Sequence, residues 1–441
     1  MATIPQVARA VQRLLGPVAE RAARATGLVQ RASKLTGARF VQTVVFGWLA
    51  QPEARLSQLA QMATTLGVAI TAQGLDGRFG RASAECLREV LEEAVQVVLA
   101  ADPVAVPVLR RFTQVAVQDC TTISLPAELA AVWPGCGGST ATSGAAALKL
   151  GVRLDLVSGR LQGPYVEAGR ANDRATTVAA LPLPPGALRL ADLGFFSLDE
   201  LAVQDAQGAY WLSRWHPGTA LFTPDGRRQE LLPLLAAAPG TTLDLPVRLG
   251  VRQRLPARLL AARVPQEVAD QRRRRVRAAA RDKGGTASAD RLALCAWTVF
   301  LSNVPPDRLT LREALVLARA RWQIELLFKL WKGHQRVDEW RSANPWRLLT
   351  EVFAKLVAAM VQHWLVLVGC WRYPDRSLTR AAQAIQAHAP QLAAGFAAYP
   401  QLCHALHTVA RCLAAVGRLN ARKTAPSTAQ LLLALDAEDL A

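Results

Sequence analysis

Two short apolar segments that each end in an aspartate constrain the fold most strongly. Residues 115–119 are apolar and β-branched up to Gln118 and Asp119, and residues 188–192 repeat the arrangement up to Asp192. Short segments of this composition predict β-strands, so the pattern puts a carboxylate at the end of each of two strands. The chain is therefore expected to fold around a sheet that carries acidic groups where strands end.

The segments around these strands predict an α/β protein built from several parts. Residues 147–156 and 161–166 predict a hairpin that completes a three-stranded meander, and residues 292–300 predict a later buried strand. Apolar periodicity and turn signals divide the chain into a helical N-terminal domain at 1–105, a first core part at 106–207, an inserted β-rich basic subdomain at 208–290, a second core part with a glutamate-bearing helix at 291–345, and a helical C-terminal region at 346–441.

The charge balance points to a polyanionic partner. The 441-residue chain has 52 Lys and Arg against 34 Asp and Glu, and its 51% of hydrophobic residues are enough for a full core. Nucleic acid is the first candidate. Residues 251–283 hold eleven Lys or Arg and three Asp or Glu, and such a run can bind phosphate backbones through counterion release. A solvated or disordered charge run is the alternative.

Other classes of protein fit the sequence less well. The most apolar stretch, residues 353–371, carries Lys355, Gln362 and His363, so it predicts a buried helix and no membrane partner. Residues 1–16 lack the uninterrupted apolar core of a signal peptide, which predicts a cytoplasmic protein. The seven cysteines are scattered and never spaced as Cys-x-x-Cys, so neither a disulfide framework nor a zinc site is indicated.

A basic helix carries a third acidic candidate. A capping box at residues 310–313 opens a helix that is expected to run to about Lys332. On that helix Arg321, Lys329 and Lys332 share a face with Glu325, and the opposite face is apolar. Pairing between Glu325 and these cations is the simplest explanation of the helix taken alone.

Asp119, Asp192 and Glu325 together supply the carboxylates that a two-metal phosphoryl-transfer site requires. Carboxylate oxygens are hard ligands suited to Mg²⁺. Two ions roughly 4 Å apart can stabilise both the attacking and the leaving oxygen of an in-line displacement. Cations on the glutamate helix would hold the phosphates that flank the reacting bond.

These residues resemble the motifs of the insertion sequence 4 family of bacterial DDE transposases. The family motif is Tyr-x2-Arg-x3-Glu-x6-Lys, and Arg321, Glu325 and Lys332 match it at the right intervals. Residues 118–122 resemble the family's first aspartate motif, and residues 191–196 resemble the second. The likeness covers most of the chain and is specific as a combination, although each aspartate motif alone is weak.

One position departs from the family motif. Ala318 stands where the motif has tyrosine, so a hydroxyl that would contact a phosphate is missing. The departure leaves the three carboxylates intact. It concerns the handling of the DNA end more than the metal chemistry.

The resemblance implies a ribonuclease H-like mixed sheet flanked by helices, and a DNA-cutting and DNA-joining enzyme. Asp119, Asp192 and Glu325 would hold two Mg²⁺ ions, with Mn²⁺ able to take their place, for nicking, hairpin formation and strand transfer. Trp297 or Trp322 would stack on a flipped base, although burial in the core is the simpler explanation of either. The charge run and the resemblance together give the candidate DNA contacts Arg321, Lys329, Lys332, Trp322, Trp297, Arg272, Arg273, Arg274 and Arg275.

The implied partners are the element ends, the target DNA and a second copy of the chain in a synaptic complex at the nucleoid. The helical N-terminal domain at 1–105 is expected to bind DNA. The C-terminal helices, with Arg418, Arg422 and Lys423, are the expected contact with the second copy and with DNA. Three alternatives remain open: a repurposed or impaired copy that only binds DNA, a ribonuclease H-like nuclease without strand transfer, and a structural basic protein.

Overall fold

The computed structural model describes residues 2–31, 33–137, 144–419 and 426–438. Its residues form two compact units. The first comprises Met1–Val106, Val117–Ala180 and Trp322–Gln430, and the second comprises Pro107–Ala116, Leu181–Arg321 and Leu431–Ala441. Both units contain helices and β-strands, and the predicted α/β class with a mixed sheet is confirmed.

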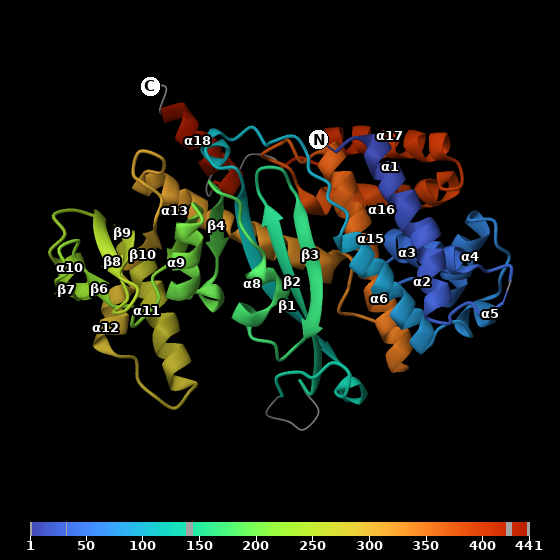
Figure 1. Ribbon diagram of the computed structural model, residues 1–441, viewed down its shortest axis with the longest axis horizontal. Coiled ribbons are helices and arrows are strands. Elements are labelled where there is room, and N and C mark those ends of the chain that lie inside the picture. Colours follow the sequence, from blue (N-terminus) through green and yellow to red (C-terminus); the bar gives the residue numbers. More distant parts are fainter. Residues whose placement is uncertain (1, 32, 138–143, 420–425, 439–441) are drawn as a thin grey trace. The chain divides into compact units, whose positions relative to one another are not determined.

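Most helices of the first unit come from the two ends of the chain (Figure 1). Thr3, Thr36 and Thr71 cap three of them with their side chains, which explains where these helices begin. The helical pattern predicted for residues 1–105 is confirmed, while a DNA-binding role for that stretch stays a prediction. The helices and π-helical turns that the two ends of the chain give to this unit are α1 (Ile4–Arg13), η1 (Leu14–Val18), α2 (Ala19–Ala25), α3 (Gly37–Ala50), α4 (Leu56–Thr65), α5 (Ala72–Asp76), α6 (Arg81–Val95), α14 (Trp322–Lys329), η5 (Leu330–His334), α15 (Pro345–Gly369), α16 (Leu378–Gly395) and α17 (Tyr399–Val416).

Helix α15 is the central helix of the first unit. Asn344 caps it ahead of Pro345, and nearly every residue from Leu348 to Leu367 is buried. Its length and composition would allow it to cross a bilayer, but 94% of its most apolar window is buried inside the protein. The predicted buried helix at residues 353–371 is thus confirmed, ending at Gly369.

Three neighbouring strands of the sheet, in the order β3-β2-β1, belong mainly to the first unit. Strands β2 and β3 are antiparallel with Leu150 opposite Val166, so the predicted hairpin is confirmed. The first two residues of β1 belong to the second unit. The strands and the short elements near them are β1 (Val115–Leu125), η2 (Ala127–Leu129), β2 (Ala146–Asp155), β3 (Leu161–Ala168), η3 (Asp173–Ala175) and α8 (Thr177–Ala180).

The prediction that the first strand ends at Asp119 is wrong. Strand β1 continues six residues further, to Leu125. Its residues are buried up to Gln118, intermediate or exposed from Asp119 to Thr122, and buried again at Ile123 and Leu125. The apolar run therefore marks the part of the strand that is covered on both faces, and the polar continuation has the alternation of a half-exposed strand. Asp119 lies where the strand leaves the core.

The second unit is built on a mixed sheet in the order β4-β5-β10-β9-β8-β6-β7. Strands β4 and β5 are parallel, with Leu190 opposite Leu212, and the strand pairs from β5 onward to β7 are antiparallel. Trp211, Leu259 and Leu301 lie in its core. The elements are α7 (Pro107–Arg110), β4 (Leu188–Ala191), η4 (Leu193–Phe195), α9 (Leu198–Ala206), β5 (Tyr210–Arg214), β6 (Leu221–Phe222), β7 (Arg228–Gln229), α10 (Leu231–Ala236), β8 (Thr242–Leu249), β9 (Leu255–Arg263), α11 (Gln266–Arg281), α12 (Ala289–Leu294), β10 (Trp297–Ser302) and α13 (Leu311–Ala320).

The strand predicted at residues 292–300 is only partly correct. Residues up to Leu294 belong to α12, which Ser288 caps by accepting a hydrogen bond from the Arg291 N–H. The strand β10 begins at Trp297. A short apolar run does not reveal such a division, because it satisfies helix and strand patterns equally well.

The last element among the described residues is α18 (Thr428–Glu438), which follows a segment that is not described. Arg422 and Lys423, two residues of the predicted dimer contact, lie outside the described residues. Arg418, the third, pairs with Asp375 at 3.0 Å within the first unit. A role for Arg418 at a dimer contact stays a prediction.

His363 on α15 makes the stability of the first unit depend on pH. The buried ring donates from Nε2 to the Gly159 carbonyl oxygen at 2.7 Å, in the turn between β2 and β3. Burial lowers the pKa of His363 from 6.5 to about 4. Between those values the unfolded chain binds a proton that the folded chain does not, so we expect the free energy of unfolding to fall as the pH falls.

The expected slope from this group approaches roughly 1.4 kcal/mol per pH unit within that window, and its contribution is complete above pH 6.5. Urea unfolding at a series of pH values measures it. His363→Gln should lose this part of the slope, whereas His404→Gln, at an exposed position on α17, should keep it. An unchanged slope in His363→Gln would contradict the assignment.

Candidate active site

Each of the two candidate aspartates accepts a hydrogen bond from the residue that follows it. Oδ1 of Asp119 accepts from the Cys120 N–H at 2.8 Å, and Oδ1 of Asp192 accepts from the Leu193 N–H at 2.8 Å. Both side chains are partly exposed. A hydrogen bond from the N–H of the next residue fixes the orientation of a carboxylate without burying it, which suits a group that binds a ligand.

Asp192 also confirms the predicted strand end in the second unit. Strand β4 stops at Ala191, and Asp192 caps the short helix η4 that follows. The start of the strand is bonded to an earlier part of the chain, because the Leu188 N–H donates to the Gln114 carbonyl oxygen at 2.8 Å. The backbone on both sides of Asp192 is therefore fixed by hydrogen bonds.

Glu325 lies on a helix with one buried face. Helix α14 (Trp322–Lys329) follows α13, and Arg321 between them keeps helical dihedral angles. Ile324 and Leu327 are buried, as the apolar face predicts, while Glu325 is partly exposed. Thr310 and Glu313 form the predicted capping box at the start of α13.

Helical structure reaches Lys332, as predicted, but its last turn is not an α-helix. Residues Leu330–His334 form a π-helical turn, η5, which contains one more residue per turn than an α-helix. Trp331 is buried there. Lys332 donates from Nζ to the Thr122 carbonyl oxygen at 2.8 Å. Within the first unit this bond ties the segment after Glu325 to β1, three residues beyond Asp119.

Helix α13 is anchored by an ion pair that sequence patterns do not reveal. Arg111 contacts Glu313 at 2.7 Å and donates to the Arg308 carbonyl oxygen at 3.1 Å. Burial raises the pKa of Glu313, but hydrogen bonds from Arg111 and Thr310 outweigh it, and the net pKa is lowered. Glu313 therefore stays ionised and holds the start of α13 in place.

The arginines predicted to bind DNA on the basic run divide into two kinds. Arg272 donates to the Trp297 carbonyl oxygen and to Thr298, both at 3.0 Å, and Arg273 contacts Asp270 at 2.7 Å. Arg274 and Arg275 on the same helix α11 are exposed. The run is an ordered helix, and its first two candidates hold the fold of the second unit together. DNA contact by Arg274 and Arg275 stays a prediction.

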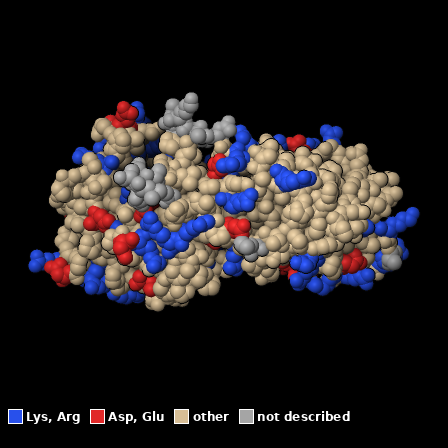
Figure 2. Space-filling view, turned by 90° about the horizontal axis from the view of Figure 1, so that it is seen from above, with Lys and Arg blue, Asp and Glu red and all other residues tan. Residues whose placement is uncertain are grey.

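Basic groups are spread over the face of the protein that Figure 2 draws. On the face drawn in Figure 2, Lys and Arg side chains lie among uncharged residues with Asp and Glu interspersed. Such a face does not single out one binding surface by charge alone. Local arrangements of a few arginines are more informative.

The two candidate tryptophans differ in exposure. Trp322 is 46% exposed, so burial does not explain it, and Lys329 Nζ lies 4.8 Å from its ring centroid. Trp297 is partly buried against the core of the second unit, with Arg263 5.9 Å from its ring centroid. Of the two, Trp322 has the face that a base could stack on.

The candidate carboxylates belong to both units. Asp119 and Glu325 lie in the first unit, and Asp192 lies in the second. Among the described residues, no three His, Cys, Asp or Glu side chains gather closely enough to hold a metal ion. The chemistry of the donors nevertheless fits a hard divalent cation, because all three are partly exposed carboxylates.

The family model of the transposase DDE domain matches residues 110–361, more than half of the chain. The chain belongs to this family. The matched transposase DDE domain contains Asp119, Asp192 and Glu325, and the resemblance drawn from their motifs is confirmed. A DDE domain implies the use of a divalent metal ion and DNA as the partner.

Similarity to individual transposases extends beyond this domain. The chain is 26% identical to the transposase for insertion sequence element IS231B of Bacillus thuringiensis subsp. berliner, over 78% of the chain and 75% of the relative. It is 23% identical to the transposase for insertion sequence element IS1151 of Clostridium perfringens, over 79% and 77%. A putative transposase InsL for insertion sequence element IS186A of Escherichia coli is 30% identical over 40% of the chain and 50% of the relative.

Proposed function

We propose that the chain is the transposase of an insertion sequence, which binds the terminal inverted repeats of its own element, cuts the DNA ends and joins them to target DNA. The observation that carries this proposal is the family match over the region that holds all three carboxylates. The similarity to insertion sequence transposases along most of the chain supports it.

The carboxylates Asp119, Asp192 and Glu325 would hold two Mg²⁺ ions, with Mn²⁺ able to take their place. When bound, such ions stabilise the attacking and the leaving oxygens of a phosphoryl transfer. The hydrogen bonds that backbone N–H groups donate to Asp119 and Asp192 orient these carboxylates in advance. Arg321, Lys329 and Lys332 would hold the phosphates beside the reacting bond, and Lys332 would exchange its bond to Thr122 for a phosphate.

Cutting would proceed by in-line attack of water on the phosphorus, which releases a 3′-hydroxyl at the element end. That hydroxyl would attack the opposite strand to form a hairpin, and after opening it would attack target DNA. Trp322 would support the distorted end by stacking on an unpaired base. A homodimer in a synaptic complex, acting in the cytoplasm at the nucleoid, would bring two ends together.

A second candidate function rests on one residue. Ala318 lies on α13 where the family motif has tyrosine, which favours a copy that binds DNA ends but processes them poorly. A plasmid carrying the DNA on both sides of the gene, incubated with the protein and Mg²⁺, separates the two. Excised element with hairpin ends supports the active transposase; binding by a folded protein without any cleavage overturns it.

Restoring the tyrosine tests the importance of the missing hydroxyl. We expect Ala318→Tyr to raise the rate of end processing by up to roughly tenfold or to leave it unchanged, because a hydrogen bond to a charged phosphate contributes about 1.5 kcal/mol or more. Ala318 is partly exposed, so the position can accept a larger side chain. Ala318→Phe is the matched control and should give no increase. A large fall in Ala318→Tyr would show that this face of α13 meets something other than the DNA end.

A further inference from the structure

An open cleft of about 780 Å³ lies within the first unit, apart from the carboxylates. One wall is the connection between α3 and α4, including Glu53 and Arg55, and the other is the segment after the glutamate helix, including Arg336 and Arg341. Gly333, the residue directly after Lys332, also lines it. The cleft therefore continues the part of the chain that carries the transposase motif.

The lining of this cleft carries an excess of positive charge. Arg55, Arg336 and Arg341 line it, and Glu53 is the one acidic residue among its lining residues in the described part of the chain. Arg336 also pairs with Glu339 at 2.9 Å, outside the lining. The three arginines still outnumber the two carboxylates and attract further anions, because the low-dielectric walls of a cleft focus the field of the cations. Arginine suits this purpose, since its planar guanidinium matches phosphate oxygens.

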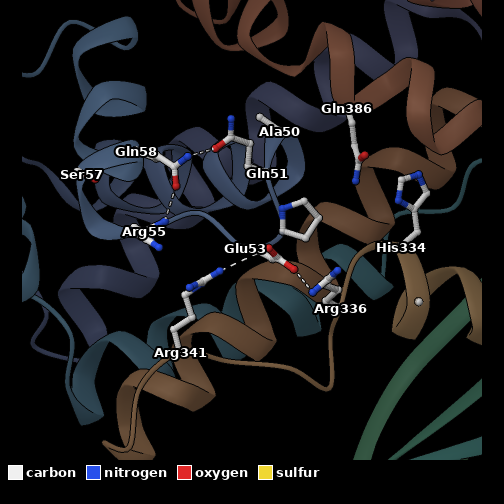
Figure 3. A pocket seen from close by; sticks show the side chains of 12 residues that line it. Ala50, Gln51, Glu53, Arg55, Ser57, Gln58, His334, Arg336, Arg341 and Gln386 are labelled. Carbon is white, nitrogen blue, oxygen red and sulfur yellow. Dashed lines mark hydrogen bonds and ion pairs between the residues drawn. The ribbon is translucent and has the colours of Figure 1, made fainter.

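Glu53 holds two of these arginines (Figure 3). Arg336 Nη1 contacts Glu53 Oε1, and Arg341 Nη2 lies 3.4 Å from Glu53 Oε2. A single oxyanion between two guanidinium groups is the arrangement in which a phosphate would be bound. All three side chains are between 41% and 47% exposed, so water and salt screen each pair and an arriving anion can replace the carboxylate readily.

The cleft is positioned by buried and local hydrogen bonds. The Arg336 backbone has a φ of +50°, and its carbonyl oxygen accepts from the buried Lys355 Nζ at 3.0 Å. On the other wall the Arg55 N–H donates to Gln58 at 2.8 Å at the start of α4. The backbones that carry the arginines are thus fixed before any ligand binds, which lowers the entropy lost on binding.

We propose that this arginine cleft, formed by Arg55, Arg336 and Arg341, binds the phosphate backbone of DNA, and that Glu53 is a built-in competitor which DNA displaces. The proposal rests on the proposed function only in taking DNA as the ligand. It assigns a binding site outside the three carboxylates, joining the N-terminal helices to the segment after the motif lysine. A purely structural ion network is the alternative that the experiment must exclude.

Binding of the full chain to a short labelled duplex of arbitrary sequence, over a series of salt concentrations, tests the proposal. The double variant Arg336→Gln/Arg341→Gln should weaken binding roughly tenfold or more and lower the salt slope by about two, since each lost phosphate contact removes about 0.9. The matched control Arg24→Gln/Arg81→Gln removes two exposed arginines that pair with Glu20 and Glu85 in the same unit, and it should change both quantities much less.

Removing the competitor gives a result in the opposite direction. Glu53→Gln should bind the duplex several-fold more tightly than the wild type, and more tightly than Glu85→Gln, which makes the same change of net charge beside Arg81. Partial unfolding cannot produce such a gain. Equal affinities for Glu53→Gln and Glu85→Gln, or equal losses in the two double variants, overturn the proposal.

The result is independent of cleavage, because all these variants keep the three carboxylates. If the three carboxylates proved to be assigned wrongly, the binding measurement would still test the arginine cleft. Wild-type binding that is insensitive to the cleft variants overturns the cleft and leaves the proposed function standing. Failure of the wild-type chain to bind any duplex would overturn both.

Discussion

Glu325→Gln is expected to lower the rate of DNA cleavage at the element ends by on the order of a thousandfold or more, while the protein stays folded and still binds DNA. The substitution keeps the size of the side chain and removes its charge, so a metal ligand becomes a weak neutral donor. Because the apolar face of α14 remains buried through Ile324 and Leu327, the fold should be unaffected. Cleavage of a plasmid that carries the element ends, followed over time with Mg²⁺, measures the effect.

The two aspartates provide the companion variants. Asp119→Asn and Asp192→Asn should cause losses of similar size, because residues of one catalytic set act as a unit and their effects do not add. Glu92→Gln on α6, at an exposed position, is the matched control and should cleave like the wild type. Full cleavage by any one of the three variants would show that this carboxylate has been assigned wrongly.

Lys355→Met is expected to lower the free energy of unfolding by about 3 to 5 kcal/mol. The buried Nζ donates to Glu351 at 2.7 Å, to the Arg336 carbonyl oxygen at 3.0 Å and to the Glu339 carbonyl oxygen at 2.8 Å. These three bonds use all three N–H groups of the ammonium. Methionine would fill the space but leave a buried carboxylate and two carbonyl oxygens without their donor.

Urea unfolding at neutral pH measures this loss. Burial lowers the pKa of Lys355, and the opposing charge of Glu351 raises it again in part, so the pair is a coupled unit. The double variant Glu351→Leu/Lys355→Met should therefore recover part of the stability, since it removes the uncompensated charge. A loss below about 1 kcal/mol in Lys355→Met, the value of an exposed pair, would contradict the role assigned here.

The sequence predicts the secondary structure where the pattern is local. The hairpin of β2 and β3, the strand end at Asp192 and the capping box before α13 depend on neighbouring residues, and all three are present. The motif residues were also recognisable, because their spacing alone identifies them. Their place in the fold was less predictable: β1 runs past Asp119, since a half-exposed strand lacks the apolar run that marks a buried one.

Features that depend on distant residues escaped prediction. The π-helical turn at Leu330–His334 has no signal in helical periodicity, and it changes the direction in which Lys332 points. Lys355 and Glu53 each meet partners that tertiary structure brings to them, so no spacing rule singles them out. Arg272 and Arg273 carry the same charge as their neighbours in the sequence, yet only the fold reveals that they support β10 and α12.

The left-handed backbone at Arg336 distinguishes two kinds of selection. A glycine adopts a φ of +50° with almost no steric penalty, whereas an arginine is strained there by on the order of 1 kcal/mol or more. Backbone strain alone would favour glycine at this position. The arginine thus opposes local stability through its backbone, and the proposed contact with DNA would supply the trade-off with activity that accounts for its presence.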